Sequence, residues 1–334
     1  MKKNLIALAV AGAVAAPMAA QADATIYGVF DVEVAQLDDG QDSGLFVMGR
    51  NTRLGFKGSE DLGNGLKAIW QVENDLDVGT NQIGANNSAT TWARRNTYVG
   101  LAGGFGAVIL GRYDTPYKLV GRKVDLFGHH LGDARGITGW NNHDQRLDNV
   151  VAYKTPNMGG FGVLAAVVTA DNTTANSDIA AVSINGTYAK GPLFVGAAYQ
   201  SIDNAAGDNT AWRIAASYKM GAFRVVGLYD SSTDDSVNTD YSTIGIGGSF
   251  KTGAHTIKAQ FYTAEQDTGT TPNAKADLLA VGWDYGLSKK TTVYAEYAAI
   301  TNKDGANRSM FSNTVVPAAN DDPSGLGVGL RIKF

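Results

Sequence analysis

The stretch that decides the fold is the last one, Leu326-Gly327-Val328-Gly329-Leu330-Arg331-Ile332-Lys333-Phe334. Every second residue is large and apolar, and the residues between them are glycine or a cation. Side chains two residues apart lie on the same face of a β-strand. The segment therefore predicts a strand with one wholly apolar face, which includes Phe334, and one small or cationic face.

The same alternation recurs through the chain. Large apolar or alanine side chains alternate with mainly polar or small ones over residues 67–73, 212–220, 257–262, 279–287 and 292–299. In a soluble antiparallel sheet the polar face meets outside water, whereas in a membrane barrel the apolar face meets lipid and the polar face meets the lumen. Periodicity alone does not distinguish these two arrangements.

The N-terminus has the features of a secretory signal peptide. Met1, Lys2 and Lys3 form a short positive region, residues 5–16 are almost wholly apolar, and Ala20-Gln21-Ala22 has the small-x-small pattern of a cleavage site. We therefore expect a signal peptide over residues 1–22 and one mature domain over residues 23–334. A membrane anchor is the alternative, but the apolar run of about 12 residues is shorter than the roughly 20 that a spanning helix needs.

After residue 22 the apolar residues are spread too thinly for a spanning helix, although 44% of the chain is hydrophobic. A closed barrel is the other structure that pairs every backbone N–H and C=O within lipid. Aromatic residues also gather toward the ends of the alternating segments, as in the girdles of barrels. The sequence thus predicts an all-β fold, a transmembrane antiparallel β-barrel in a Gram-negative outer membrane. A soluble secreted β-protein, such as an adhesin, is the alternative.

The connections alternate between tight turns and long polar loops, as they do at the two rims of a bacterial barrel. Tight turns are expected at residues 60–64, 102–104, 157–160, 190–192 and 286–289, and long loops at 38–44, 79–91, 116–144, 171–178, 203–209, 267–275 and 302–323. Every proline after residue 22 lies in or beside a connection, where it removes no ladder hydrogen bond. The alternating segments number about 16, which predicts a lumen too wide for side chains to fill and hence an aqueous channel.

The charge balance argues against a nucleic-acid partner. Removal of Lys2 and Lys3 leaves 28 − 2 = 26 basic residues against 32 acidic ones, a net charge of 26 − 32 = −6, and nucleic-acid binders usually show a basic footprint. There is no cysteine, which excludes disulfides and cysteine-dependent redox or metal chemistry. We predict no cofactor and no metal site. The acidic pairs at residues 38–39, 234–235 and 321–322 could bind a divalent cation, but their contribution to solubility is the simpler explanation.

The longest mid-chain insertion, residues 116–144, is the candidate for narrowing the lumen. A loop of this length without clear strands is usually functional or disordered. Folded into the barrel it would form an eyelet, and as an external loop it would only be surface. Its charged and histidine side chains are Lys118, Arg122, Lys123, Asp125, His129, His130, Asp133, Arg135 and Asp144.

Arginines recur on the side of the alternation that we expect to face the lumen. They are Arg53, Arg95, Arg112 and Arg146, each out of phase with apolar or aromatic neighbours. Arginine stays charged at any relevant pH. A wall of arginines opposite Asp125 and Asp133 would set up a transverse field that filters ions and polar solutes. The plainer interpretation is that these arginines are ordinary wetted lumen residues.

Four short motifs resemble those of the general porins of Gram-negative bacteria, which are trimeric sixteen-stranded channels. Residues 24–28 (ATIYG) resemble the family's first strand, 52–58 (TRLGFKG) its second-strand motif, 124–128 (VDLFG) its constriction-loop motif and 331–334 (RIKF) its assembly signal. The resemblance implies that Arg53, Arg95 and Arg146 are wall arginines of the eyelet and that Asp125 is the loop acid. Arg94 departs from a single-arginine pattern, so which of Arg94 and Arg95 faces the lumen stays open.

The resemblance also implies partners. We expect a homotrimer in outer-membrane lipid and lipopolysaccharide, with Phe334 read by the barrel-assembly machinery, passing ions and small hydrophilic solutes. A substrate-specific channel for a sugar or organic anion is the alternative, but Tyr262 and Tyr294 are too few lumen aromatics to support a binding slide. An outer-membrane hydrolase needs a nucleophile and a base in reach, and none of the four histidines lies in such a motif.

Overall fold

The computed structural model describes residues 23–76, 78–79, 92–169, 179–204, 206–269, 272–310 and 316–334. The predicted signal peptide, residues 1–22, lies outside the described residues, as do most of the expected loop 79–91 and all of the expected loop 171–178.

Nearly all of the described chain is strand. The strands are β1 (Asp23–Asp38), β2 (Ser43–Gly49), β3 (Arg53–Gly63), β4 (Leu66–Asp75), β5 (Thr97–Gly103), β6 (Gly106–Asp114), β7 (Arg146–Lys154), β8 (Phe161–Thr169), β9 (Ile179–Lys190), β10 (Leu193–Ile202), β11 (Asn209–Met220), β12 (Phe223–Asp234), β13 (Thr239–Thr252), β14 (His255–Asp267), β15 (Ala274–Gly286), β16 (Thr291–Lys303) and β17 (Ser324–Lys333). Three short helical turns lie between β6 and β7, namely α2 (Pro116–Arg122), α3 (Arg135–Thr138) and the 3-10 turn η1 (Gly139–Asn141).

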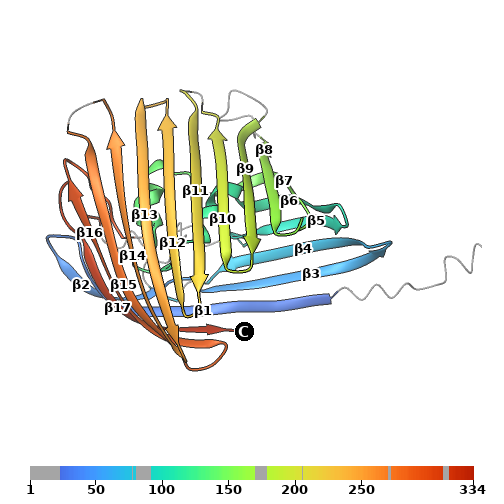
Figure 1. The fold of residues 1–334 in the computed structure, drawn as a ribbon, viewed down its shortest axis with the longest axis horizontal. Coiled ribbons are helices and arrows are strands. Elements are labelled where there is room, and N and C mark those ends of the chain that lie inside the picture. Colours follow the sequence, from blue (N-terminus) through green and yellow to red (C-terminus); the bar gives the residue numbers. More distant parts are fainter. Residues whose placement is uncertain are drawn as a thin grey trace, which may run out of the picture.

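The strands close into a ring. From β3 onward each strand pairs antiparallel with the next, and β17 returns to pair with β1. Both β2 and β3 pair with β1, and residues 50–52 interrupt them, so they are two parts of one crossing. The described chain therefore has 17 − 1 = 16 crossings, which confirms the predicted barrel. Figure 1 shows β9 to β17 as a curved wall with the helical turns behind it.

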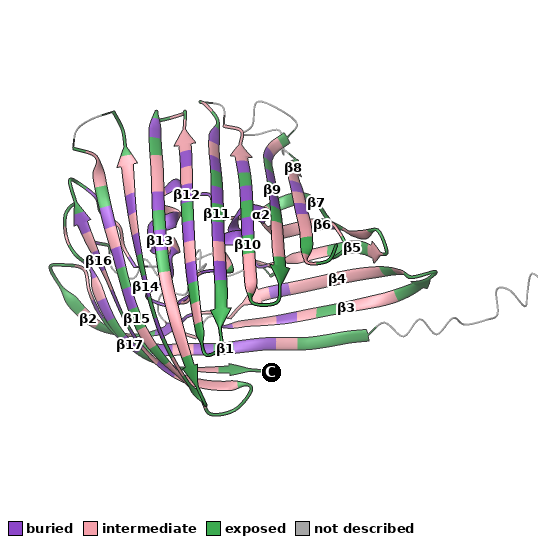
Figure 2. Ribbon diagram, in the orientation of Figure 1, coloured by how far each residue is buried: buried purple, intermediate pink, exposed green. Residues whose placement is uncertain are grey.

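The two faces of the wall differ as the alternation predicts. On β11, Trp212 and Ile214 are 42% and 48% exposed on the outer face, whereas Arg213 between them is 1% exposed. Figure 2 shows this alternation of buried and exposed residues along the strands. Because the apolar side chains point out and the charged ones point in, the wall has the polarity of a membrane barrel. None of the described helices is long and apolar enough to cross a membrane.

The connection between β6 and β7 folds inward, and we call residues 115–145 the inner segment. Its helix α2 begins where Thr115 accepts a hydrogen bond from the Lys118 backbone N–H, at 3.3 Å, and Pro116 occupies the first turn, both common helix-start features. Helix α2 packs against β9, β10 and β11, and α3 contacts β14 and β15. The expectation that this loop lies inside the barrel is confirmed.

Candidate functional site: the pore constriction

The inner segment is held against one side of the lumen. The Tyr117 hydroxyl donates to Asp230 on β12 at 2.6 Å. Two of its backbone N–H groups donate to wall side chains, Leu126 to Gln260 at 2.9 Å and Leu131 to Glu296 at 2.8 Å. The apolar side chains that it turns toward this wall are fully buried, namely Val124, Phe127, Leu131 and Ile137. The segment therefore narrows the lumen from the β9–β16 side and leaves its other face toward β3–β7.

A network of arginines and carboxylates lies on the opposite wall. Arg95 binds Glu73 at 2.6 Å through Nε and Asp75 at 2.9 Å through Nη1. Arg53, the first residue of β3, lies 3.3 Å from the same Glu73 carboxylate. These four side chains thus form one ionic cluster, in which the Arg53 side chain keeps the largest exposed fraction, 23%.

A second cluster joins the wall to the inner segment. Arg146, the first residue of β7, lies 3.2 Å from Asp114 at the end of β6, and its Nε donates to Asn96 at 2.9 Å. The same Asp114 binds Lys118 of α2 at 2.7 Å. Burial lowers the pKa of Lys118 to about 8 against the opposing effect of Asp114, and the neighbouring charges of Arg146 and Arg135 contribute to the lowering.

The loop carboxylates Asp125 and Asp133 are buried and paired with loop arginines. Asp133 is 0% exposed and accepts from Arg122 at 2.9 Å and from Arg135 at 2.6 Å. The two guanidiniums hold the pKa of Asp133 well below its usual range, against the cost of burial. Burial and the charge of Asp133 raise the pKa of the covered Asp125 to about 6. Asp125 and Asp133 are thus paired within the loop, Asp125 with Arg122 and Asp133 with Arg122 and Arg135, and their position opposite the arginine wall stays a prediction.

His129 lies beside the loop arginine Arg135. It has a positive φ of 72°, and its Nδ1 is 3.3 Å from Arg135. Burial lowers the pKa of His129 well below its usual value, and the charges of Arg122, Arg135, Arg95 and Arg53 lower it further. Positive charge from both the loop and the wall therefore opposes a proton on His129.

Arg112 has different surroundings from the other wall arginines. Arg112 was expected in the lumen because it is out of phase with Ile109, but Ile109 is 4% exposed and packs inside with Val150 and Ala152. A register shift at Gly111, which has a φ of 140°, interrupts the alternation of β6. Arg112 pairs instead with the exposed Asp148, at 2.5 Å.

The guanidinium of Arg95 joins the Glu73 cluster, and the backbone of Arg94 contacts Asn74 and Arg112. Both residues precede β5, so strand alternation does not apply to them. Sequence reasoning missed the counter-charges Glu73, Asp75 and Asp114, although Glu73 already stood on the polar side of its segment.

Comparison with known proteins gives the family. A family model described as Gram-negative porin matches residues 7–305. The chain is 32% identical to outer membrane porin protein 32 of Delftia acidovorans, with all of both chains covered. It is 28% identical to major outer membrane protein P.IB of Neisseria gonorrhoeae, with 95% of this chain and 98% of that one covered.

A solved structure agrees with these sequence matches. The anion-selective porin from Comamonas acidovorans superposes with a TM-score of 0.83 at 26% identity, over 94% of this chain and 100% of that chain. Its barrel therefore follows that of the present chain almost from end to end. The closed barrel, the inner segment and these matches together show that the chain belongs to the Gram-negative porin family, whose members form water-filled outer-membrane channels for passive diffusion of ions and small hydrophilic solutes.

Proposed function

We propose that the narrowest part of this channel lies between the inner segment and the wall that carries Arg53, Arg95 and Arg146, and that it favours small anions. The observation that carries the proposal is the layering of charge. Arg53 and Arg122 keep exposed side-chain fractions of 23% and 22%, whereas Asp133 keeps 0%. A permeating ion in the gap therefore meets guanidinium groups before it meets the carboxylates behind them.

The balance of charge around the gap supports the same preference. Six cations are Arg53, Arg95, Lys118, Arg122, Arg135 and Arg146, and five acids are Glu73, Asp75, Asp114, Asp125 and Asp133. The difference, 6 − 5 = +1, is small. The sign of the field at the gap is set by the cations because they are nearer to the water, where local charge decides ion passage. The structural relative named above is an anion-selective porin.

Reversal potentials in a planar bilayer with a salt gradient test this proposal. We expect the reversal potential of the purified protein to show a higher permeability for chloride than for potassium. A higher permeability for potassium would contradict the proposal. The same recordings address the substrate-specific alternative, because a specific channel for a sugar or organic anion would be blocked by that solute at micromolar concentration.

We propose the remaining assignments from family resemblance and local contacts. Residues 1–22 are a signal peptide, and the mature chain is a homotrimer in lipid and lipopolysaccharide. The assembly machinery reads Phe334, which pairs with Gly28 through its backbone and stacks on Phe30 at 5.9 Å. The chain has no catalytic role, and release of fatty acid from phospholipid by pure protein would contradict that assignment.

A further inference from the structure

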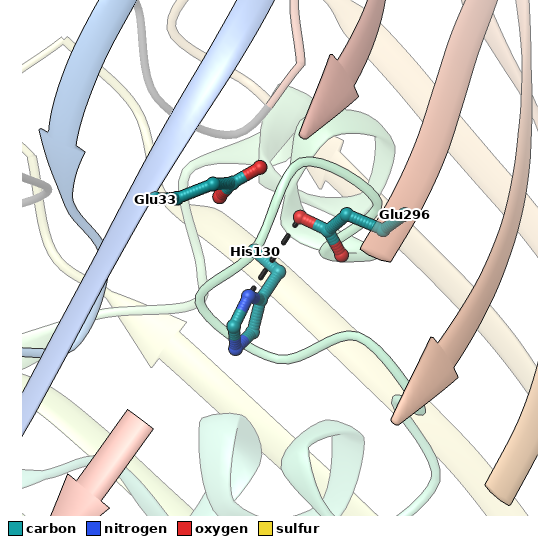
Figure 3. Close-up of side chains that lie close together, drawn as sticks. All are labelled: Glu33, His130 and Glu296. Carbon is teal, nitrogen blue, oxygen red and sulfur yellow. Dashed lines mark ion pairs between the residues drawn. The ribbon is translucent and has the colours of Figure 1, made fainter. Parts of the chain in front are cut away.

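The tip of the inner segment carries a histidine into a buried group of acids. His130 lies between Glu33 on β1 and Glu296 on β16, and one nitrogen or oxygen from each lies within 4.8 Å of the others. Figure 3 shows the two carboxylates converging from different strands above the imidazole ring. The three residues are 2%, 0% and 2% exposed, in the order named. This convergence brings together residues about 100 and 160 positions apart, so the sequence alone gave no sign of it.

Each of the three residues keeps an unused polar atom. Glu33 Oε1, Glu296 Oε2 and His130 Nδ1 are buried and have no hydrogen-bond partner among the residues that the structure describes. The other oxygens are engaged, since Glu33 Oε2 accepts from Arg50 and Glu296 Oε1 accepts from the Leu131 N–H. Buried polar atoms without a partner are costly, so three of them in one group point to a ligand.

The surroundings also orient the histidine as a ligand. Asp31 Oδ2 lies 3.4 Å from His130 Nε2, and the Tyr294 hydroxyl holds the same carboxylate by donating to Oδ1 at 2.9 Å. Arg331 Nη1 also lies 3.3 Å from His130 Nε2. Metal binding through Nδ1 requires the tautomer in which Nε2 carries the proton and donates it to Asp31, which leaves the Nδ1 lone pair toward Glu296. Metal-binding histidines usually donate their second nitrogen to a carboxylate in this way.

The charge of the group is incomplete without a further cation. The three carboxylates of Asp31, Glu33 and Glu296 face two guanidiniums, those of Arg50 and Arg331. The remaining 3 − 2 = 1 negative charge is buried, and burying an uncompensated charge is costly. Either a proton held within this group or a bound metal ion would offset this charge.

We propose that Glu33, His130 and Glu296 bind a divalent transition-metal ion of the Zn²⁺ type. One imidazole and two carboxylates suit such an ion, whereas Ca²⁺ takes six to eight oxygens. Tetrahedral ligands about 2.1 Å from zinc lie roughly 3.4 Å apart, so these side chains would close by at most about 1.4 Å on binding. The ion ties the tip of the inner segment to β1 and β16. This site is separate from the arginine gap and does not rest on the proposed anion preference.

Metal binding by the detergent-extracted mature protein tests the proposal. After treatment with a chelator, calorimetric titration with Zn²⁺ alone is expected to show a single tight site per chain, and Co²⁺ is expected to give the visible absorption of a site with nitrogen and oxygen ligands. His130→Gln and Glu33→Gln are expected to weaken Zn²⁺ binding at least tenfold.

His255→Gln is the matched control. His255 is an exposed histidine beside Trp283, so its loss removes a surface imidazole and leaves the buried site intact. Equal Zn²⁺ uptake by His130→Gln and wild type would overturn the proposal, and so would a wild-type titration without uptake, because then a proton within the group supplies the missing charge. Glu33→Gln keeps the shape of the side chain and decides the question if His130→Gln does not fold.

Discussion

Asp133 orients the two arginines that the inner segment carries, Arg122 and Arg135. Its carboxylate accepts from Arg122, from Arg135 and from two backbone N–H groups, those of His129 and Arg135. Five N–H groups are directed at this buried carboxylate, two of them from the Arg135 guanidinium. They explain why the pKa of Asp133 is lowered although burial alone would raise it. The acid is therefore a positioning residue, which sets where two guanidiniums point.

Replacing Asp133 should loosen the inner segment. Asp133→Asn leaves Arg122 and Arg135 without their shared acid, and removal of one partner of a buried ion pair costs about 3–5 kcal/mol. Because the folded pKa is lowered, the contribution of Asp133 is present above the unfolded pKa of about 4 and is lost as the pH falls below it. The measurement is the heat-unfolding midpoint at pH 7. Asp125→Asn, whose carboxyl has fewer ionic partners, should cost less, and equal losses would contradict this account.

His143 should make stability depend on pH. It is 0% exposed, and burial lowers its pKa to about 4. Between pH 6.5 and 4 the unfolded chain binds a proton that the folded chain excludes. The free energy of unfolding therefore decreases by about 1.4 kcal/mol for each unit by which the pH is lowered. His143→Gln should flatten the unfolding midpoint over this range. His255→Gln, an exposed histidine, should leave the slope unchanged, and a slope unchanged by both variants would exclude His143 as its source.

The wall arginines should set the selectivity. A charge 4 Å from a permeating ion contributes about 1 kcal/mol in water. Removing three such charges in Arg53→Gln, Arg95→Gln and Arg146→Gln together should therefore lower the anion-to-cation permeability ratio roughly tenfold after screening. Reversal potential is the measurement. Arg112→Gln removes the same kind of charge from an ion pair outside this network, and an equal shift in that control would argue against the role of the wall.

At the scale of elements, the strands could be predicted from the sequence and the internal contacts could not. Alternation is a local property, so it predicted the outer faces of β11, β14, β15, β16 and β17. It failed at β6, where the shift at Gly111 displaces the pattern, and before β5, where Arg94 and Arg95 are not in a strand. The counter-charges and the group around His130 depend on the ring closing, which brings distant residues together.

The inner segment is the element that should control conductance. Deletion of residues 123–131 removes Val124, Phe127 and Leu131, which fasten the segment to the wall, and frees part of the lumen. Single-channel conductance should rise well above that of wild type. Lengthening the external turn at residues 235–238, which lies between β12 and β13, is the control and should leave conductance unchanged. A deletion variant with wild-type conductance would show that the segment does not limit the pore.

For the whole molecule, the property on which the channel depends is that the outer face of the barrel wall is apolar and its inner face is charged. Closure of β1 on β17 leaves no free edge in the described sheet, so the backbone is satisfied in lipid. Side chains then decide which medium each face accepts. Ile184 and Thr187 lie on the same strand, β9, but Ile184 is 42% exposed on the outer face, whereas Thr187 is half-buried on the inner face and donates to Gly162 at 3.3 Å.

Replacement by lysine at each of these two positions tests which face of the barrel wall meets lipid. Ile184→Lys places a charge in lipid and should destabilise the assembled barrel by about 2–4 kcal/mol near the membrane midplane. Thr187→Lys places the same charge in the aqueous lumen, where it keeps its hydration, and should cost less than about 1 kcal/mol. Heat unfolding of both variants in lipid vesicles gives the comparison. Equal losses, or a larger loss for Thr187→Lys, would mean that the apolar face does not meet acyl chains, and the channel would lose its physical basis.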